Sequence, residues 1–520
     1  MSKVHTRVGC PRWVGRLASS VAVVALAAGG AGWAHARGTV ARPAWTGFAA
    51  DAQHTGVAAA SPQPLDNVHW QVRVDHHPQY AGGEGPFSHY GSPMITSTNT
   101  VVVPTRIGAR KGFELRAYDG ANGHRTWRLP THYTLPLGAS TQFPPPLPAT
   151  LVDDRHVAVA AAGGTLLIRS GVGHASGRVT RVAFYGLRHW RAHRAAYRSA
   201  VQISTPLTTG PDGSLYFGFS ATPDAPGHLR SGIARISASG HGSWVAARDL
   251  AGAGHKARVA LACAPALSPD GSTGYVAVVS TTRSRLVGFD TATLAPKYRH
   301  RLTDPQTGAA AEVLDQSSAT PTVGPDGDVF YGVLGNPIAE HDDRGWLLHF
   351  DSHLRTVETP GSFGWDQTVS VVPASSVPGY AGSSSYLLVS KYNNYLGGPL
   401  GDGRNRLALL DPHAAQTDRY SSVQVMAEVR TVLSPRHPPN TPAGTRYEWC
   451  INAIAVDPVT GSAIANNEDG RLYRWDLATG QLTDHIRLNG PRGQAYTSTV
   501  IGPDGTAYAI QNAVLYAVGG

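Results

Sequence analysis

Four stretches of the chain repeat one pattern. An apolar run meets a Pro-Asp-Gly turn and continues as a run of alternating aromatic and β-branched residues. Proline presets the first turn angle, aspartate bonds to the turn backbone, and glycine accepts a positive φ, so each copy predicts a tight hairpin. The copies are TPLTTGPDGSLYFGFS (205–220), APALSPDGSTGYVAVVS (264–280), TPTVGPDGDVFYGVLG (320–335) and STVIGPDGTAYAIQN (498–512).

A second element follows several hairpins: a strand that ends in aspartate and then a tight turn, as in FELRAYDGANGHRTW (113–127) and LYRWDLATGQL (472–482). Each unit then holds four strands, the size of a propeller blade. Counting weaker copies, eight units start near residues 93, 149, 206, 265, 321, 369, 453 and 499, about 58 residues apart on average. We therefore predict an all-β chain that folds as a single eight-bladed β-propeller.

The two ends of the repeat region complement each other. The last unit stops one strand short after residues 513–518, and an isolated strand, NVHWQVRV (67–74), precedes the first unit. Pairing them would complete blade eight and leave no open sheet edge. We expect the propeller to span 67–520 after a leading segment at 37–66. The long interval from 369 to 453 leaves seven blades as an alternative, and we expect loop insertions on one face around 374–450.

Residues 1–36 have the features of a secretory signal. Lys3, Arg7, Arg12 and Arg16 form a basic region without an acid, residues 17–28 are apolar, and small residues at 34 and 36 suit cleavage. The apolar run is too short to span a membrane. Loss of the leader lowers the formal net charge from +9 to about +5, which is mild for this length. We expect a secreted or periplasmic monomer with no membrane anchor and no nucleic-acid partner.

Two cysteines remain after the leader, Cys263 and Cys450. They precede innermost strands three blades apart, which favours two buried free thiols over a disulfide. The basic run LRHWRAHRAAYR (187–198) is expected to be a solvated excursion between strands. The chain has no G-x-S-x-G elbow, H-E-x-x-H helix, P-loop, dinucleotide fingerprint or EF-hand-like loop, so these motif-bearing classes find no support.

Two further phrases complete the pattern. AWTGFAADAQHTG (44–56) carries Trp45 and then Asp51-Ala52-Gln53-His54-Thr55-Gly56, and the first unit carries Leu115, Asp119, Gly123 and Trp127 in the order L-x-x-x-D-x-x-x-G-x-x-x-W. Together with the hairpins, these residues resemble the pyrroloquinoline-quinone (PQQ)-like β-propeller repeat family over roughly 44–520. The resemblance implies that Trp127 docks between neighbouring blades.

The resemblance leaves function open, because the family contains scaffolds as well as dehydrogenases. Catalytic members typically carry an adjacent Cys-Cys pair over the quinone and sometimes a C-x-x-C-H haem site, and this chain has neither. We therefore favour a binding or scaffold module. The alternative is an oxidoreductase that uses PQQ and Ca²⁺ on alcohols or sugars. A propeller hydrolase or lyase is a weaker third hypothesis.

Propellers usually bind ligands where loops lead into the innermost strands at the channel mouth. These loops share an aromatic or acidic residue followed by small hydroxylated residues, which suits a small molecule, a glycan or a protein partner. Converging carboxylates could also hold Ca²⁺ or act as acid and base. The predicted metal ligands are Asp315, Asp366 and Glu448. The predicted binding residues are His89, Tyr90, Asp315, Gln316, Trp365, Asp366, Gln367, Glu448, Trp449, Asn452 and Tyr496.

The opening stretch 44–56 itself matches no catalytic motif. We expect it to lead the chain into the closing strand, with Trp45 and Phe48 packed against the outside of a terminal blade. His54 would then bond to a turn and take no part in catalysis.

Overall fold

The fold is described from a computed structural model of the chain. The described residues are 43–78, 89–108, 112–136, 143, 145–254, 256–280, 284–314, 317–336, 344–393, 402–449, 451–490 and 498–520. The predicted signal segment, Asp315, Gln316, Cys450 and Tyr496 lie outside these ranges.

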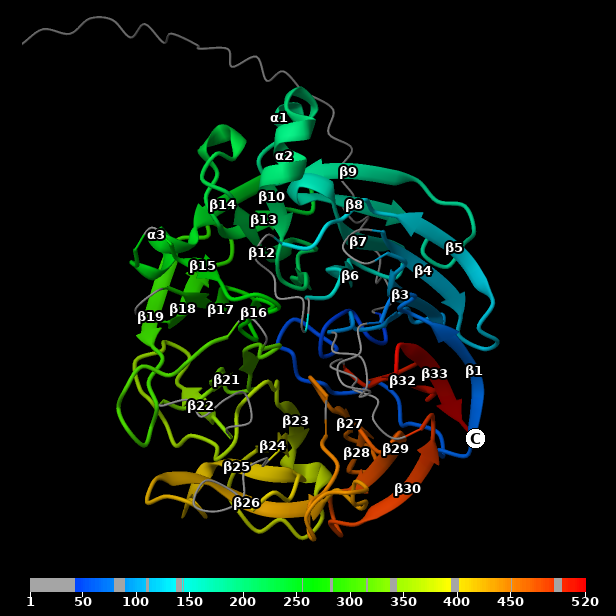
Figure 1. Cartoon of the computed structure of the whole chain (residues 1–520), viewed down its shortest axis with the longest axis vertical. Coiled ribbons are helices and arrows are strands. Elements are labelled where there is room, and N and C mark those ends of the chain that lie inside the picture. Colours follow the sequence, from blue (N-terminus) through cyan, green and yellow to red (C-terminus); the bar gives the residue numbers. More distant parts are fainter. Residues whose placement is uncertain are drawn as a thin grey trace, which may run out of the picture.

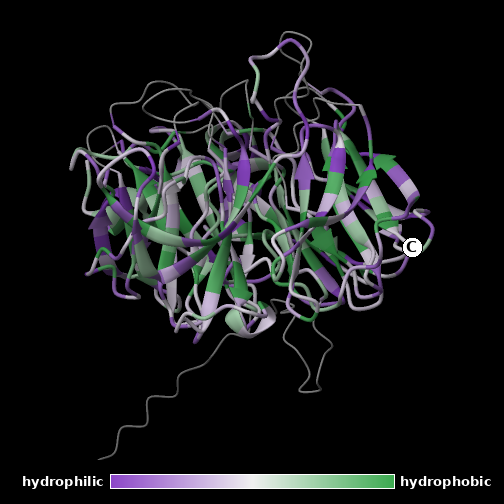
Figure 2. Ribbon diagram, turned by 90° about the horizontal axis from the view of Figure 1, so that it is seen from below, coloured by the Kyte–Doolittle hydropathy of each residue, from purple (hydrophilic) through white to green (hydrophobic). Residues whose placement is uncertain are grey.

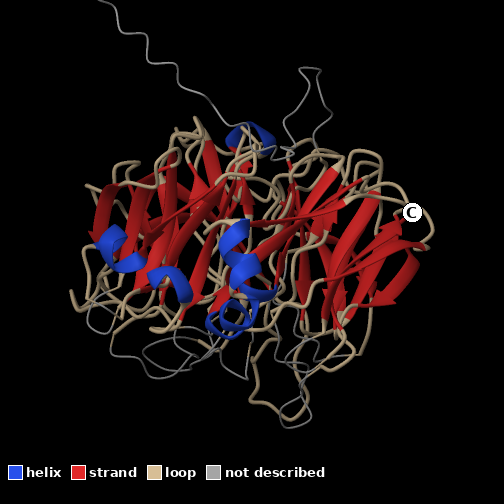
Figure 3. Cartoon of the chain, turned by 90° about the horizontal axis from the view of Figure 1, so that it is seen from above, coloured by secondary structure: helices blue, strands red, loops and turns tan. Residues whose placement is uncertain are grey.

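Eight antiparallel sheets stand around a central axis as the blades of one propeller (Figure 1). Each innermost strand begins within two residues of a predicted unit start, so eight blades are confirmed and the seven-bladed alternative is wrong. Seen edge-on, the strands run between two faces of a thick disc (Figure 3). We call the end where the chain enters the innermost strands the mouth face, and the end carrying the Pro-Asp-Gly turns the turn face.

The strands of the first four blades, in chain order within each, are as follows. Blade 1 holds β2 (Met94–Ile95), β3 (Thr100–Arg106), β4 (Phe113–Asp119) and β5 (Arg125–Pro130), and blade 2 holds β6 (Ala149–Leu151), β7 (His156–Ala161), β8 (Thr165–Ser170) and β9 (Val179–Ala183). Blade 3 holds β10 (Val201–Ile203), β11 (Thr208–Thr209), β12 (Leu215–Ala221), β13 (Gly232–Ile236) and β14 (Gly242–Ala246). Blade 4 holds β15 (Arg258–Val259), β16 (Ala266–Leu267), β17 (Thr273–Val279), β18 (Arg285–Asp290) and β19 (Pro296–Arg301).

The last four blades follow the same plan, except that blade 5 has three described strands. Blade 5 holds β20 (Thr322–Val323), β21 (Val329–Val333) and β22 (Trp346–Phe350), and blade 6 holds β23 (Ser370–Pro373), β24 (Tyr386–Tyr392), β25 (Arg406–Thr417) and β26 (Gln424–Leu433). Blade 7 holds β27 (Ala455–Asp457), β28 (Ser462–Asn467), β29 (Arg471–Asp476) and β30 (Leu482–Arg487). Blade 8 holds β31 (Val500–Ile501), β32 (Ala507–Gln511), β33 (Val514–Gly519) and β1 (Asn67–Arg73).

Short helices lie at the rim of the ring (Figure 1): α1 (Leu187–Ala192), α2 (Arg194–Ala200) and α3 (Ala247–Ala251), with 3-10 turns at Ala162–Gly164, Pro226–His228 and Ala374–Ser376. The basic run 187–198 forms most of α1 and α2. It is only partly solvated, because Trp190 and Tyr197 are buried and the Tyr197 ring stacks on Tyr185 at 4.1 Å. None of the helices in the described ranges is long and apolar enough to cross a membrane.

The core lies between neighbouring blades, where strands turn apolar residues inward, while polar residues collect on the loops of both faces (Figure 2). Trp127 shows how blades dock. Its Nε1–H donates to the carbonyl of Val172 in blade 2 at 2.7 Å, and the Arg169 guanidinium lies 4.1 Å from its ring centroid. The docking expected from the family resemblance is thus observed.

The ring closes as predicted from the sequence. Strand β1 pairs antiparallel with β33, from Asn67 opposite Gly519 to Arg73 opposite Val514, and so forms the outer strand of blade 8. Trp70 of β1 repeats the docking of Trp127, since its Nε1–H donates to the carbonyl of Gly120 in blade 1 at 2.7 Å. Both chain ends of the ring therefore meet within one sheet.

Residues 44–58, which we call the central segment, lie in a different place from the one predicted. They cross the middle of the ring (Figure 1), and Trp45 is fully buried against β2. Innermost-strand amides donate to this segment: those of Leu151, Leu267, Val323, Val371 and Val456 donate to the carbonyls of Thr46, Ala52, Gln53, Thr55 and Gly56, at 2.7 to 2.9 Å. The expectation that Trp45 and Phe48 pack outside a terminal blade is therefore wrong.

The physical reason is the backbone of the innermost strands, whose inward-facing N–H groups need acceptors away from water. The central segment supplies carbonyls to blades 2, 4, 5, 6 and 7 and exchanges two bonds with blade 1 through Trp45 and Ile95. The prediction rested on the aromatic residues and His54. It could not include the backbone pairing, because an irregular segment that pairs through its backbone leaves no periodic signal in the sequence.

The long interval in blade 6 also differs from the prediction. The loop 374–385 joins β23 to β24 at the turn face, whereas 434–449 leads into β27 at the mouth face. The insertions are therefore split between the two faces, because an odd number of strands separates them. Much of the extra length lies in the long strands β25 and β26.

Candidate functional site

The channel mouth brings together side chains from blades on opposite sides of the ring. His89 precedes β2 in blade 1, Ser318 precedes β20 in blade 5, and Asp366 precedes β23 in blade 6. Lys391 is the next-to-last residue of β24, and Asn452 precedes β27. All five are at least nine-tenths buried, so the mouth holds a buried polar group set, which we call the mouth cluster.

Asp366 is the best-connected member of the mouth cluster. Its Oδ1 accepts from the Ser318 N–H at 2.6 Å and from the Ser318 hydroxyl at 2.7 Å, and its Oδ2 lies 4.0 Å from the Lys391 ammonium. The residue has a φ of +51°, a left-handed conformation that aspartate tolerates better than most residues. This conformation turns the carboxylate across to blade 5.

Asn452 joins the cluster through Ser318, whose Oγ lies 2.7 Å from the Asn452 side-chain amide. The Ser318 hydroxyl has one proton, and it donates this proton in its hydrogen bond to Asp366. It can therefore only accept from Asn452, so the Asn452 amide fits best with its NH₂ group toward Ser318. The Asn452 carbonyl accepts from the Thr368 N–H at 2.9 Å, which ties blade 7 to blade 6 beside the site.

His89 adds an imidazole with a shifted acidity. Its pKa is lowered to about 4, chiefly by burial, with Asp366 opposing the shift and Lys391 adding to it. At neutral pH the ring is therefore neutral, so one ring nitrogen can donate a hydrogen bond and the other can accept one. Its ring lies 5.7 Å from that of Phe143.

An apolar pocket opens beside these groups. Tyr90 forms one wall, with its hydroxyl held by Asp75 at 3.4 Å, and Phe48 of the central segment contributes to the lining. The Phe48 ring in turn packs edge-on against His54, at 5.4 Å between centroids. The other apolar lining residues are Pro104, Pro146, Leu147, Ala149, Pro206 and Ala262, and His89, Ser92, Ser318 and Asn452 provide its polar side.

The remaining predicted residues take other roles or lie elsewhere. Both ends of the Gln367 amide are used inside blade 6, by the Phe363 carbonyl and the Ser390 hydroxyl. Trp449 is fully buried in the core, 5.7 Å from the Tyr473 ring. Trp365 is nine-tenths buried, and its backbone N–H donates to the Arg344 carbonyl. The backbone carbonyl of Glu448 accepts from the Glu468 N–H. The structure thus brings together His89, Tyr90, Asp366 and Asn452.

Sequence reasoning missed Ser318, Lys391 and Phe48. Lys391 had a usable signal, because it interrupts the apolar strand YLLVSKY at a position where a charge must be buried. Ser318 lies in one of the mouth loops but carries no distinctive chemistry in sequence. Phe48 was named in the sequence analysis but predicted to pack on the outside of a blade, whereas it lines the pocket.

The mouth cluster does not make a calcium site from its described residues. Ca²⁺ takes six to eight oxygen ligands. Asp366 is the one described carboxylate in the cluster, and a cation there would sit next to the Lys391 ammonium. Of the predicted metal ligands, Asp315 lies outside the described residues, so the set with Asp366 and Glu448 stays a prediction.

No family model matches this chain, and no curated protein matches it. Among solved structures it is similar to a europium-containing methanol dehydrogenase, with a TM-score of 0.52, 10% identity, and coverage of 90% of this chain and 89% of that one. A quinohemoprotein alcohol dehydrogenase from Comamonas testosteroni gives a TM-score of 0.52 and 13% identity, covering 93% and 78%. BamB from Moraxella catarrhalis gives 0.43 and 12%, covering 87% and 98%. At these identities, the two dehydrogenases show the propeller fold alone.

Proposed function

We propose that this chain is an exported propeller of the PQQ-like type that binds a small polar ligand at its channel mouth. The observation that carries the proposal is the mouth cluster: an ammonium and a carboxylate, both about 95% buried, beside an apolar pocket. Removing such charges from water costs several kcal/mol for each ion. A buried ion pair is therefore a poor route to stability, and its position beside Ser318, which lines the pocket, favours a role in binding.

The pocket suits a ligand with one apolar side and several polar groups. Tyr90, Leu147 and Phe48 would contact the apolar side, while Lys391 would donate to an anionic or carbonyl oxygen. Neutral His89 and Asp366 would accept from ligand hydroxyl or amine groups. Because the central segment contributes Phe48 to the pocket lining, we expect a ligand to enter from the mouth face, where the loops lead into the innermost strands.

The export part of the proposal rests on the leader pattern of residues 1–36. The PQQ-like assignment rests on the repeat phrases and on the fold shared with the two dehydrogenases. The PQQ and Ca²⁺ oxidoreductase remains the second hypothesis, which the same experiment tests.

The experiment is a thermal-shift screen of purified chain against amino acids, organic acids and sugars, with PQQ plus Ca²⁺ as a separate arm. A ligand that binds the folded state raises Tm with its concentration. We expect Lys391→Met and Asp366→Asn to abolish the shift of any ligand that the wild type binds. The matched control is Asp418→Asn, which breaks another buried pair, with Arg344 at 2.7 Å, and should lower Tm without removing the ligand shift.

Two results would contradict the proposal. A ligand shift that survives both mouth substitutions would place binding elsewhere on the molecule. Saturable PQQ binding with alcohol-dependent dye reduction, lost in Asp366→Asn, would favour the oxidoreductase.

A further inference from the structure

A pair of carboxylates sets the Pro-Asp-Gly turn of blade 5 apart from its three counterparts. In the other turns a hydroxylated residue follows glycine: Ser214, Ser272 and Thr506. The Ser214 and Ser272 hydroxyls donate to the turn aspartates Asp212 and Asp270, at 2.7 and 2.8 Å. In blade 5 this residue is Asp328, which as a carboxylate cannot donate to Asp326.

The backbone of the blade 5 turn is nevertheless the same. The Asp328 N–H donates to Asp326 Oδ1 at 3.0 Å, as the Ser214, Ser272 and Thr506 N–H groups do to their own aspartates at 2.9 to 3.0 Å. The second carboxylate is therefore an addition to an unchanged turn. It gives this turn a second negative charge that the other three turns lack.

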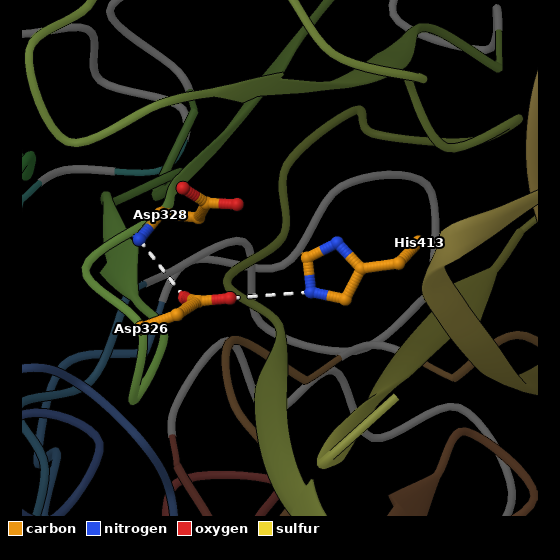
Figure 4. A group of neighbouring side chains, drawn as sticks. All are labelled: Asp326, Asp328 and His413. Carbon is orange, nitrogen blue, oxygen red and sulfur yellow. Dashed lines mark hydrogen bonds and ion pairs between the residues drawn. The ribbon is translucent and has the colours of Figure 1, made fainter. Parts of the chain in front are cut away.

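A histidine of blade 6 lies against this turn. His413, on β25, points at the turn, and its Nε2 lies 3.2 Å from Asp326 Oδ2 (Figure 4). One ligand atom each from Asp326, Asp328 and His413 can be chosen so that all lie within 4.8 Å of one another. The His413 position also differs from most repeats: it lies two residues after Asp411, where three other blades have Ala121, Ala292 and Ala478 after the matching aspartate and blade 5 has His353.

Two further side chains hold the carboxylates in place. His349, fully buried on β22, has its Nε2 3.0 Å from Asp328 Oδ2. The Tyr386 hydroxyl donates to Asp326 Oδ1 at 3.0 Å. Metal-binding carboxylates are commonly fixed by such outer contacts, which orient the remaining lone pairs.

The charge of this group is unbalanced. Within the described residues, the ion pairs of Asp326 and Asp328 involve only histidines, with no lysine or arginine. An imidazole in its neutral form offers a hydrogen bond but no positive charge. A divalent cation would supply that charge and bind both side-chain types at once.

We propose that Asp326, Asp328 and His413 bind one divalent transition-metal ion of the Zn²⁺ type on the turn face, between blades 5 and 6. With bonds of about 2.0–2.1 Å, ligand atoms at a tetrahedral Zn²⁺ lie roughly 3.3 Å apart, close to the 3.2 Å between His413 Nε2 and Asp326 Oδ2. The imidazole favours Zn²⁺ over Ca²⁺ or Mg²⁺, which prefer oxygen ligands throughout.

The ion would act as a staple between two blades. It would join the turn of blade 5, which carries Asp326 and Asp328, to β25 of blade 6, which carries His413. His413 and Asp326 are both more than a third exposed, so water can reach the site and complete the coordination of an ion. The site lies on the face opposite the mouth cluster and does not depend on the proposed ligand binding.

The test is titration calorimetry of the chelator-treated, purified chain with ZnCl₂, and separately with CaCl₂, together with thermal unfolding. We expect one Zn²⁺ per chain and a higher Tm with Zn²⁺. Asp328→Ser and His413→Ala each restore the residue found in other blades, so both should fold. Each should weaken Zn²⁺ binding about tenfold or more and remove the Tm rise.

Two controls isolate the cluster. His353→Ala removes the histidine at the equivalent repeat position of blade 5, and should leave Zn²⁺ binding unchanged. Ser214→Asp builds an acidic turn without histidines in blade 3, and should add no second ion. The proposal is overturned if the wild type shows no saturable Zn²⁺ binding, if Zn²⁺ affinity is unchanged in Asp328→Ser and His413→Ala, or if Ca²⁺ binds as tightly as Zn²⁺.

Discussion

At the scale of single residues, the central segment depends on one glycine. Gly56 has a φ of +67°, and a Cβ there would lie 2.5 Å from Ser370 Oγ and 2.6 Å from the Ile454 carbonyl oxygen. Ser370 cannot easily move, because its hydroxyl donates to that carbonyl at 2.6 Å. We expect Gly56→Ala to lower the free energy of unfolding by about 3 kcal/mol, from left-handed strain and overpacking together.

Gly308→Ala is the matched control, measured by urea unfolding alongside Gly56→Ala. Gly308 has nearly the same φ, +69°, but a Cβ there has no atom within 4 Å. In Gly308→Ala the free energy of unfolding should fall only by the cost of the left-handed conformation, about 1–2 kcal/mol. Equal losses in the two variants would show that the close approach of Gly56 to blades 6 and 7 adds nothing to stability.

His54 makes stability depend on pH. Its Nδ1–H donates to the Pro321 carbonyl at 2.8 Å, and burial lowers its pKa to about 4. Between about pH 6.5 and 4 the unfolded chain binds this proton and the folded chain does not, so stability falls as the pH falls. From pH 7.5 to 4.5, His54 should remove about 2.5 kcal/mol from the free energy of unfolding.

The measurement compares wild type with His54→Gln, which can still donate to Pro321 but does not titrate. Burial raises the pKa of neighbouring Asp51, which acts with the opposite sign, so the total pH profile does not isolate His54. The difference between the two profiles does. Parallel profiles over this range would mean that His54 protonates freely in the folded state.

At the scale of strands and turns, the sequence predicted the features that repeat along the chain. The Pro-Asp-Gly turns located eight blades, and the unpaired strand at 67–74 located the closing pair, because both depend on local turn chemistry and alternation. The split of the blade 6 insertions between the two faces was not predicted. The number of strands between two loops decides whether the loops lie on the same face, and the prediction did not include that number.

The candidate site was predictable only in part, for a related reason. Loops that lead into innermost strands converge wherever the ring closes, so His89, Asp366 and Asn452 could be placed at one mouth from blade register alone. Lys391 comes from the far end of a second strand, and only the three-dimensional crossing of blade 6 brings it to Asp366. The blade register predicts which loops meet at the mouth, but it does not predict which side chains of those loops contact each other.

At the scale of the whole molecule, the central segment links blades on opposite sides of the ring. Each blade packs on its two neighbours, while residues 44–58 bond to the innermost strands of blades 1, 2, 4, 5, 6 and 7. The Ala49 N–H also lies 3.4 Å from the Ser498 hydroxyl in blade 8. The ring thus has two closures: the β1–β33 pair at its rim and the central segment in its channel.

This arrangement predicts the result of removing the segment while keeping the rim closure. A chain of residues 59–520 retains β1 and all eight blades, and a chain of residues 43–520 serves as the control. We expect the shorter chain to unfold at a clearly lower temperature, because it leaves five innermost-strand N–H groups without their carbonyl partners. Amide hydrogen exchange should also rise at Leu151, Leu267, Val323, Val371 and Val456, with outer strand β29 as the internal reference. Unchanged unfolding temperature and unchanged protection at these five amides would show that the rim closure alone holds the ring.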